Sequence, residues 1–182
     1  MLEVDACIKR FRDYVIQQSK SNLSKSGHNN TKGLYNSIDG EIVTEKGFTI
    51  VGFKMDDYGM FVDKGIKGKT SSNRAPNSPF KFGTGSGKKG GLTQGIDKWV
   101  KQKGIQFRQK DGKGVKGQFL SYKQTSFLIR RAIWNKGIKP SLFFTKPFEA
   151  GYKKYIDVDL MKAFSHDVET MVDYNLKDIK WI

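Results

Sequence analysis

The stretch SIDGEIVTEKGFTIVGF, residues 37–53, decides the fold of this chain. Its two halves, residues 37–44 and 48–53, are rich in residues that favour strands, and Glu45-Lys46-Gly47 separates them. Two short runs of this kind joined by a glycine-containing turn are typical of an antiparallel hairpin. The sequence therefore predicts a small antiparallel sheet here.

Helical patterns lie on both sides of the hairpin. Val4, Ile8, Phe11 and Val15 recur at helical spacing, so residues 3–21 are predicted to form an amphipathic helix. After the hairpin, YGMFVDK (58–64) is expected to form a short helical turn or an extended link that Gly65 ends.

The C-terminal part is expected to hold a short strand at residues 142–144 and a long helix from about Pro147 to about Tyr174. The apolar positions of that helix should face the core: Phe148, Tyr155 or Ile156, Leu160, Phe164, Val168 and Met171. The predicted class is α+β, a small antiparallel sheet packed by an N-terminal and a long C-terminal helix.

A basic, glycine-rich stretch interrupts this frame. Residues 64–139 hold 19 Lys and Arg but only Asp97 and Asp111 as acids, a net charge of +17, whereas the other residues sum to −2. Thirteen of the 20 glycines lie in the same stretch, which indicates many loops. Residues 66–139 are therefore predicted as an insertion into a core made of residues 1–65 and 140–182. Its charge favours contact with a polyanion.

The insertion should contain two helices. Thr93 is a candidate cap for a helix at about 93–103, and Ser121 with Gln124 has the spacing of a capping box for a helix at about 121–136. Between them, Asp111-Gly112 is a candidate hairpin turn.

Cysteine usage and hydropathy exclude several classes of protein. Cys7 is the only cysteine, so neither an intramolecular disulfide nor a cysteine-based metal site can form. No signal-peptide pattern and no apolar run of about 18 residues is present, which favours a soluble protein made in a reducing cytoplasm.

The sequence offers little for catalysis. His28 and His166 lie on different predicted elements, which does not suit a metal site. The run FGTGSGKKGG is not a phosphate-binding loop, because Phe82 stands where the motif needs glycine and Lys89 where it needs Ser or Thr. We expect a protein that is not an enzyme and binds no cofactor or metal. One enzymatic alternative stays open, a small metal-dependent nuclease using acids among Asp56, Asp57, Asp157 and Asp159.

Three segments, in order, carry a resemblance to a known family: NTKGLYNSI (30–38), YGMFVDKG (58–65) and GIKPSLFFTKPFEAGYKKY (137–155). They resemble the T-G-x-L-x-x-S-I, Y-x-x-Y-V-E-x-G-T and P-F-L-x-P-A elements of the neck, or tail-completion, proteins of tailed bacteriophages. The first element is matched with one inserted residue, Lys32, and the second with Phe61 for Tyr, Asp63 for Glu and Ile66 for Thr. Pro147, Phe148 and Ala150 match the third element loosely. The resemblance covers residues 1–65 and 121–172.

The resemblance implies a structural virion protein that forms a homo-oligomeric ring at the head–tail junction. The ring would join the portal, its adaptor or a head-completion ring to a tail terminator or tail tube. Genomic DNA would pass through its lumen, and no membrane would be involved. Such a subunit is assembled in the host cytoplasm and ends in the neck of the virion.

Candidate contact residues follow from this interpretation. Lysines on the most glycine-rich segments are expected to contact DNA or an acidic partner: Lys88, Lys89, Lys110, Lys113 and Lys116. A second set is expected at a subunit or ring interface: Tyr58, Phe61, Arg130, Arg131, Phe143 and Phe144. For the aromatic members, simple core packing stays an equal alternative. A different function also stays open, a sequence-independent nucleic-acid-binding protein whose active module is residues 66–139.

Overall fold

The computed structural model describes residues 2–27, 32–46, 48–84, 91–109 and 117–177. They fall into two compact units: unit 1 comprises Met1–Asp63 and Ser141–Ile182, and unit 2 comprises Lys64–Pro140. These limits lie close to those expected for the core and the insertion. Each unit is described by itself below.

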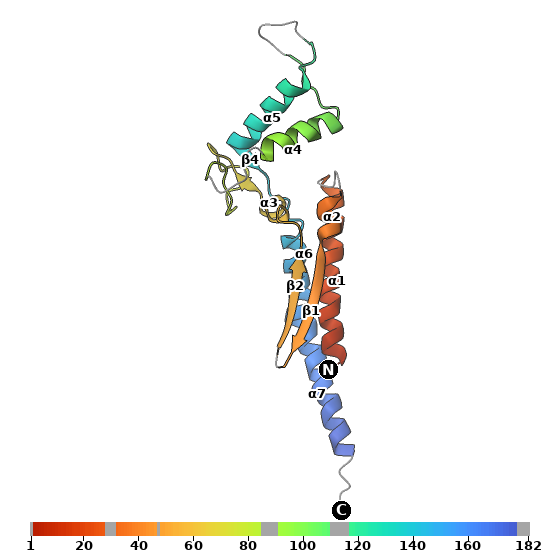
Figure 1. Ribbon diagram of the computed structural model, residues 1–182. Coiled ribbons are helices and arrows are strands. Elements are labelled where there is room, and N and C mark those ends of the chain that lie inside the picture. The colour runs from red at the N-terminus through yellow and green to blue at the C-terminus, as the bar shows by residue number, and fades with distance from the viewer. Residues whose placement is uncertain (1, 28–31, 47, 85–90, 110–116, 178–182) are drawn as a thin grey trace, which may run out of the picture. The chain divides into compact units, whose positions relative to one another are not determined.

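Unit 1 is built on a long N-terminal helix and a hairpin (Figure 1). Helix α1 (Leu2–Lys25) runs a turn beyond its predicted end, and strands β1 (Asp39–Glu45) and β2 (Phe48–Lys54) pair antiparallel with Val43 opposite Ile50. Two short helices frame the hairpin, α2 (Gly33–Ser37) and α3 (Gly59–Lys64). The predicted α+β class is confirmed.

The C-terminal helix of unit 1 has three consecutive parts: α6 (Thr145–Gly151), a π-helical segment η1 (Tyr152–Asp159) and α7 (Leu160–Lys177). The strand expected at residues 142–144 is absent, because Leu142 has a left-handed φ of 52° and the chain turns at Phe143 into α6. A left-handed residue cannot continue an extended strand, so this prediction was wrong.

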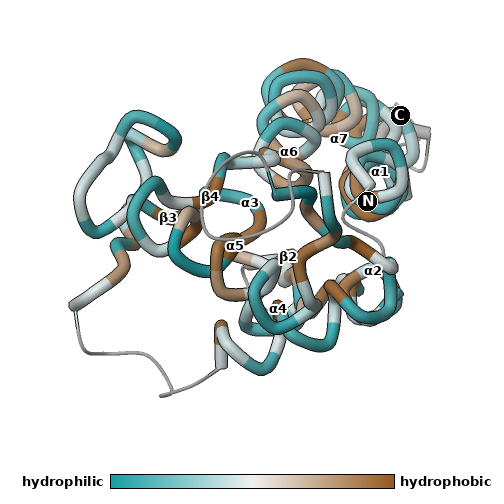
Figure 2. Tube along the Cα trace, turned by 90° about the horizontal axis from the view of Figure 1, so that it is seen from above, coloured by the Kyte–Doolittle hydropathy of each residue, from teal (hydrophilic) through white to brown (hydrophobic). Residues whose placement is uncertain are grey.

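Helices α1 and α7 run antiparallel and lie side by side, as the view along them in Figure 2 shows. The Cys7 thiol donates to the Tyr155 carbonyl oxygen at 3.2 Å, and the Asp167 carboxylate accepts the backbone N–H of Val4 at 3.2 Å and of Glu3 at 3.4 Å. Desolvation raises the pKa of Asp167, but these N–H donors lower it, and its pKa lies below the ordinary value. Asp167 thereby satisfies the N-terminal end of α1.

The core of unit 1 has two adjoining parts. Leu23, Leu34, Ile38 and Phe143 form a buried cluster. Next to it, aromatic rings pack edge to face, with centroid distances of 5.9 Å for Phe11–Phe53, 5.5 Å for Phe53–Phe144 and 5.7 Å for Phe11–Phe148. Such pairs add stability beyond the apolar area they bury.

The second half of the predicted core face is exposed instead. Phe164, Val168 and Met171 are 63%, 41% and 61% exposed, and among the α7 side chains that the structure describes, Ala163 is the buried one. The cause is η1, where the Leu160 N–H bonds to the Tyr155 carbonyl five residues back. This wider turn shifts the phase of the helix, so the α-helical spacing counted from Phe148 no longer predicts which face meets α1.

Unit 2 begins and ends in one short ladder. Strand β3 (Ile66–Lys67) pairs antiparallel with β4 (Gly137–Ile138). A Cβ on Gly68 would lie 2.0 Å from the Asn135 carbonyl oxygen, and one on Gly137 would lie 2.2 Å from that of Ile66. Only glycine permits this close approach of the two backbones.

Two helices make up the rest of the regular structure described in unit 2, α4 (Gly91–Gln102) and α5 (Tyr122–Lys136), and they pack on each other. Helix α4 begins two residues before Thr93, so Thr93 is not its cap. The predicted capping box of α5 is confirmed: the Gln124 N–H donates to Ser121 Oγ at 3.2 Å, and the Ser121 N–H donates to Gln124 Oε1 at 2.9 Å.

Candidate nucleic-acid and subunit interfaces

The described part of unit 2 presents a basic surface. Its one described acid, Asp97, accepts a hydrogen bond from the Ser126 hydroxyl, so that carboxylate is turned toward α5. Among the residues of unit 2 that the structure describes, basic side chains therefore far outnumber acidic ones. The exposed basic side chains come from helices α4 and α5 and from the loops: Lys69, Arg74, Lys81, Lys98, Lys101, Lys103, Arg108, Lys123, Arg131, Lys136 and Lys139.

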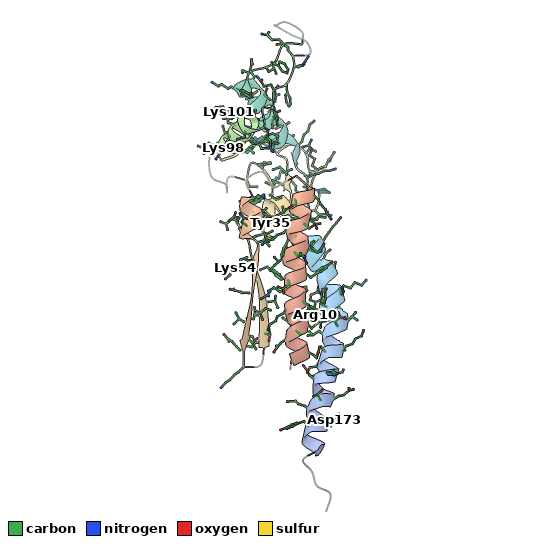
Figure 3. The ribbon with its side chains drawn as sticks, turned by 90° about the vertical axis from the view of Figure 1, so that its right-hand side faces the viewer. Arg10, Tyr35, Lys54, Lys98, Lys101 and Asp173 are labelled. Carbon is green, nitrogen blue, oxygen red and sulfur yellow. The ribbon has the colours of Figure 1, made fainter. Side chains whose placement is uncertain are left out.

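Helix α4 places two of these charges on one face. Val100 is fully buried, whereas Lys98 and Lys101, three residues apart, are exposed (Figure 3). The helix ends at Gly104, which has a φ of 63°, and the Ile105 N–H bonds back to the Val100 carbonyl at 3.0 Å. This glycine-terminated end fixes where α4 stops and holds its lysines in place.

A short antiparallel pairing precedes α5. Residues Arg108 and Phe119 form a β-bridge, and the Arg108 guanidinium lies 4.6 Å from the Phe119 ring centroid. Phe119 is 56% exposed. A cation stacked on an exposed ring offers both a charge for phosphate and a flat face for a base.

Helix α5 carries the two arginines that were expected at a protein interface. The Arg130 guanidinium lies 6.0 Å from the Phe127 ring centroid, and its Nε donates to the Ser126 carbonyl at 3.4 Å. Arg131 is exposed, and so are Phe127 at 54% and Trp134 at 39%. Arg130 thus lies against an exposed ring, and Arg131 is exposed on the same helix as Phe127 and Trp134.

The lysines predicted to contact DNA lie outside the described residues: Lys88, Lys89, Lys110, Lys113 and Lys116. The same holds for the candidate turn Asp111-Gly112. The described residues on either side of 110–116 are paired, since the Gly117 N–H donates to the Gln109 carbonyl and the Gln109 N–H to the Gln118 carbonyl, each at 2.9 Å. The basic surface described here does not include these five lysines.

The aromatic residues expected at a subunit interface divide into two pairs. Tyr58 and Phe61, at α3, are 46% and 40% exposed. Desolvation, with the nearby Asp56 carboxylate, raises the pKa of the Tyr58 phenol. Phe143 is 1% exposed and Phe144 is half-buried among the core rings, so both belong to the core alternative. A side chain buried as fully as Phe143 cannot form a docking surface.

Asp63 is a key residue whose role the sequence did not reveal. Its side chain is fully buried, and Oδ1 accepts the backbone N–H of Phe144 at 2.8 Å and of Thr145 at 3.1 Å. The Thr145 hydroxyl donates to Oδ2. The carboxylate thereby satisfies donors at the start of α6. The sequence shows an acid two residues before Gly65, but nothing in it identifies the groups that this acid binds.

The three segments that carry the family resemblance meet in unit 1. Leu34 and Ile38 of the first lie in one cluster with Phe143 of the third. A Cβ on Gly59 of the second would lie 2.9 Å from Leu34 Cδ1, and Asp63 of the second binds the backbone of the third. The three segments therefore contribute to the core of unit 1.

Two further findings concern the residues that the structure describes. No group of three or more His, Cys, Asp or Glu side chains among them is placed to hold a metal ion. No helix formed by them is long and apolar enough to cross a membrane.

Comparisons with protein-family models, with curated proteins and with solved structures found no match to this chain.

Proposed function

We propose that this chain is a structural subunit of a phage virion, a neck or tail-completion protein that forms a ring at the head–tail junction. The observation that carries the proposal is the convergence of the three resembling segments on one core. Leu34 and Ile38, Gly59 and Asp63, and Phe143 come from separate segments and contact one another or the same cluster. A chance resemblance of short motifs does not require that they meet.

The surfaces of the chain suit such a role. A ring subunit needs apolar surface for its neighbours, and Tyr58, Phe61, Phe164 and Met171 of unit 1 are all more than a third exposed. In this proposal the portal, an adaptor or a head-completion ring lies on one side, and a tail terminator or tail tube lies on the other. The role is structural, with no catalytic step.

The basic unit 2 suits the lumen of such a ring or the acidic rim of a neighbouring ring. Its charges are distributed over several elements and loops instead of forming one ordered groove. Contacts of this kind with phosphate are individually weak and fall steeply with salt, because binding releases counterions. Weak contacts would let DNA slide through the ring.

Antibody labelling of phage particles tests the proposal. Particles from the source lysate, intact and disrupted, are labelled with antibody and gold against the full chain and viewed in negative stain. Label confined to the head–tail junction is the expected result. Absence of label from both preparations, with a phage tail protein labelled in parallel as a positive control, would contradict the proposal.

The Arg108–Phe119 pair favours a second candidate, a sequence-independent nucleic-acid-binding protein that uses unit 2. The test is fluorescence anisotropy of the full chain with single-stranded and duplex DNA, from about 50 to about 200 mM salt. If the second candidate is right, Phe119→Ala weakens binding to the single strand more than to the duplex, because only unpaired bases stack. If single-stranded DNA binds equally tightly to Phe119→Ala and to the unaltered chain, Phe119 does not stack on its bases.

A further inference from the structure

The exposed side of α7 carries an apolar stripe made of Met161, Phe164, Val168 and Met171. Their spacings are three, four and three residues, which places them along one face of a helix. They are between 41% and 71% exposed. The face that meets α1 is a different one, which carries Ala163 and Asp167. Past Asp167, α7 extends beyond the start of α1 (Figure 1), and no other described element of unit 1 is seen beside its last turns.

The last turns of α7 are acidic. Residues 168–174 contain Glu169 and Asp173 and no basic residue, and Asp173 lies near the end of the described helix (Figure 3). The two acids are one helical turn apart, on the side of the stripe away from α1. A partner for this stripe should therefore combine apolar and basic side chains.

Helix α5 has a face with that combination. Phe127, Arg131 and Trp134 stand at i, i+4 and i+7, all three are exposed, and we call them the α5 face. Lys123, one turn before Phe127, adds a further positive charge, and α5 contains no acid. Phe82 packs against Trp134 at 5.4 Å and supports it from within unit 2.

We propose that the α7 stripe of one copy packs on the α5 face of a second copy. The acids near the end of the α7 stripe are opposite in charge to Arg131, which lies between Phe127 and Trp134 in the α5 face, and to Lys123. The exposed Lys162 at the start of the stripe is an exception on the α7 side. The lengths of the two surfaces also match, because 14 residues of α7 and 15 residues of α5 each span about 20 Å. Pairing either surface with its own kind puts more like charges together than pairing it with the other, which costs binding energy.

A contact between two different surfaces links copies head to tail, and such a chain of contacts closes into a ring when the rotation permits. The inference thus deepens the proposed ring function, although the contact itself does not depend on a virion. The exposed apolar side chains on the two surfaces total less than the roughly 1,000 Å² that a specific interface usually needs. A single contact should therefore be weak, so assembly requires high concentration or several contacts at once.

Sedimentation equilibrium with two charge-reversed variants of the full chain tests the contact. E169K/D173K alters the α7 side and leaves the α5 face intact, whereas K123E/R131E does the reverse. The unaltered chain should associate at concentrations up to about 1 mM, and each variant alone should associate at least tenfold more weakly. A mixture of the two should associate again, because the intact α5 face of one variant meets the intact α7 stripe of the other, and the two reversed surfaces are also opposite in charge.

Matched controls change the same number of charges elsewhere. D39K/E45K alters exposed acids of the hairpin, and K98E/K101E alters exposed lysines of α4. Both should associate as the unaltered chain does, and circular dichroism should show equal helix content in all variants.

Three results would overturn the inference: an unaltered chain that is monomeric at about 1 mM, a K123E/R131E variant that still dimerises alone, or a mixture that stays monomeric. The second would show that α7 pairs with α7. Gold label at the head–tail junction with any of these results would leave the proposed function standing and remove only this contact. Association as described without label would do the opposite.

Discussion

Units 1 and 2 are held together in different ways. Unit 1 has a buried cluster and a set of packed aromatic rings. The buried carboxylate of Asp63 joins the two stretches of sequence that make up this unit, because it binds the backbone of Phe144. In unit 2, Val100 is buried where α4 and α5 pack together. The stem of this unit is the β3–β4 ladder, where Gly68 and Gly137 allow two backbones to approach closely. The family resemblance lies mainly in unit 1, and most of the charge lies in unit 2. The segments that carry the proposed resemblance thus contribute to the core of unit 1, whereas most of the charged surface lies in unit 2.

The largest effect should come from the core of unit 1. Phe143→Ala is expected to lower the free energy of unfolding of unit 1 by about 3–5 kcal/mol, because it removes a fully buried ring and leaves a cavity. Urea denaturation followed by circular dichroism measures it. Phe119→Ala, at an exposed site in unit 2, is the control and should change stability little. Equal losses would contradict the contrast between the units.

Asp63 should come next. Asp63→Ala is expected to cost about 2–4 kcal/mol, since the N–H groups of Phe144 and Thr145 lose their acceptor in a buried place. The exposed Asp39→Ala should stay within about 0.5 kcal/mol of the unaltered chain. If the free energy of unfolding of Asp63→Ala equals that of the control, water replaces the carboxylate, and the hydrogen bonds from Phe144 and Thr145 to Asp63 are not needed for stability.

A smaller effect, confined to unit 2, is expected from Gly68→Ala. Its Cβ would lie 2.0 Å from a carbonyl oxygen, so the stem must open, at a cost of about 1–3 kcal/mol. Hydrogen exchange should show faster exchange at the β3–β4 ladder with unchanged protection in α1. Gly95→Ala, where the added Cβ meets nothing within 4 Å, is the matched control. Loss of protection in α1 would mean that the units unfold together.

Removal of unit 2 should affect unit 1 least. The Ser141 N–H bonds to the Val62 carbonyl at 3.1 Å and the Leu142 N–H to that of Asp63 at 3.0 Å, so the two ends lie side by side within unit 1. Replacing residues 64–140 by two glycines should leave the free energy of unfolding of unit 1 within about 1 kcal/mol. Thermal unfolding of the shortened chain measures it, and a chain without a cooperative transition would show that unit 1 needs unit 2.

The last prediction concerns a rate. Burial raises the pKa of the Cys7 thiol, a shift that Asp159 assists and Arg10 opposes. The folded chain should therefore react with iodoacetamide at least tenfold more slowly than the urea-unfolded chain at pH 8.5. A raised thiol pKa stabilises the fold below the unfolded pKa, and this contribution is lost as pH rises through the folded pKa. Equal rates in both states would show that Cys7 is open to reagent.

Local patterns predicted much of the fold. The apolar stripe of α1, the hairpin around residues 45–47 and the Ser121 capping box each depend on neighbours in the sequence, and each is confirmed. The strand at residues 142–144 was wrong because an apolar run alone does not reveal a left-handed Leu142. The face of α7 was wrong because η1 changes the helical period without a clear signal in the sequence.

The candidate sites were harder to predict. Arg130 and Arg131 could be placed on a helix from its caps, but their aromatic neighbour Phe127 becomes meaningful only once the buried side of α5 is known. Phe143 looked equally suited to an interface and to the core, because apolar side chains serve both. Asp63 required knowledge of a contact across about 80 residues of chain, which no local pattern holds.

The π-helical segment η1 makes the structure of this chain sensitive to deletion of a single residue. A widened turn of this kind accommodates one residue more than an α-helix needs, so the number of residues between 152 and 159 sets the rotation of everything after it. Losing one residue there would turn the whole of α7 about its axis while leaving its composition untouched. Met161 or Phe164 could then face α1, and Ala163 could face solvent. The number of residues in η1 thus determines which side chains of α7 are exposed, and deleting one residue there would change that set.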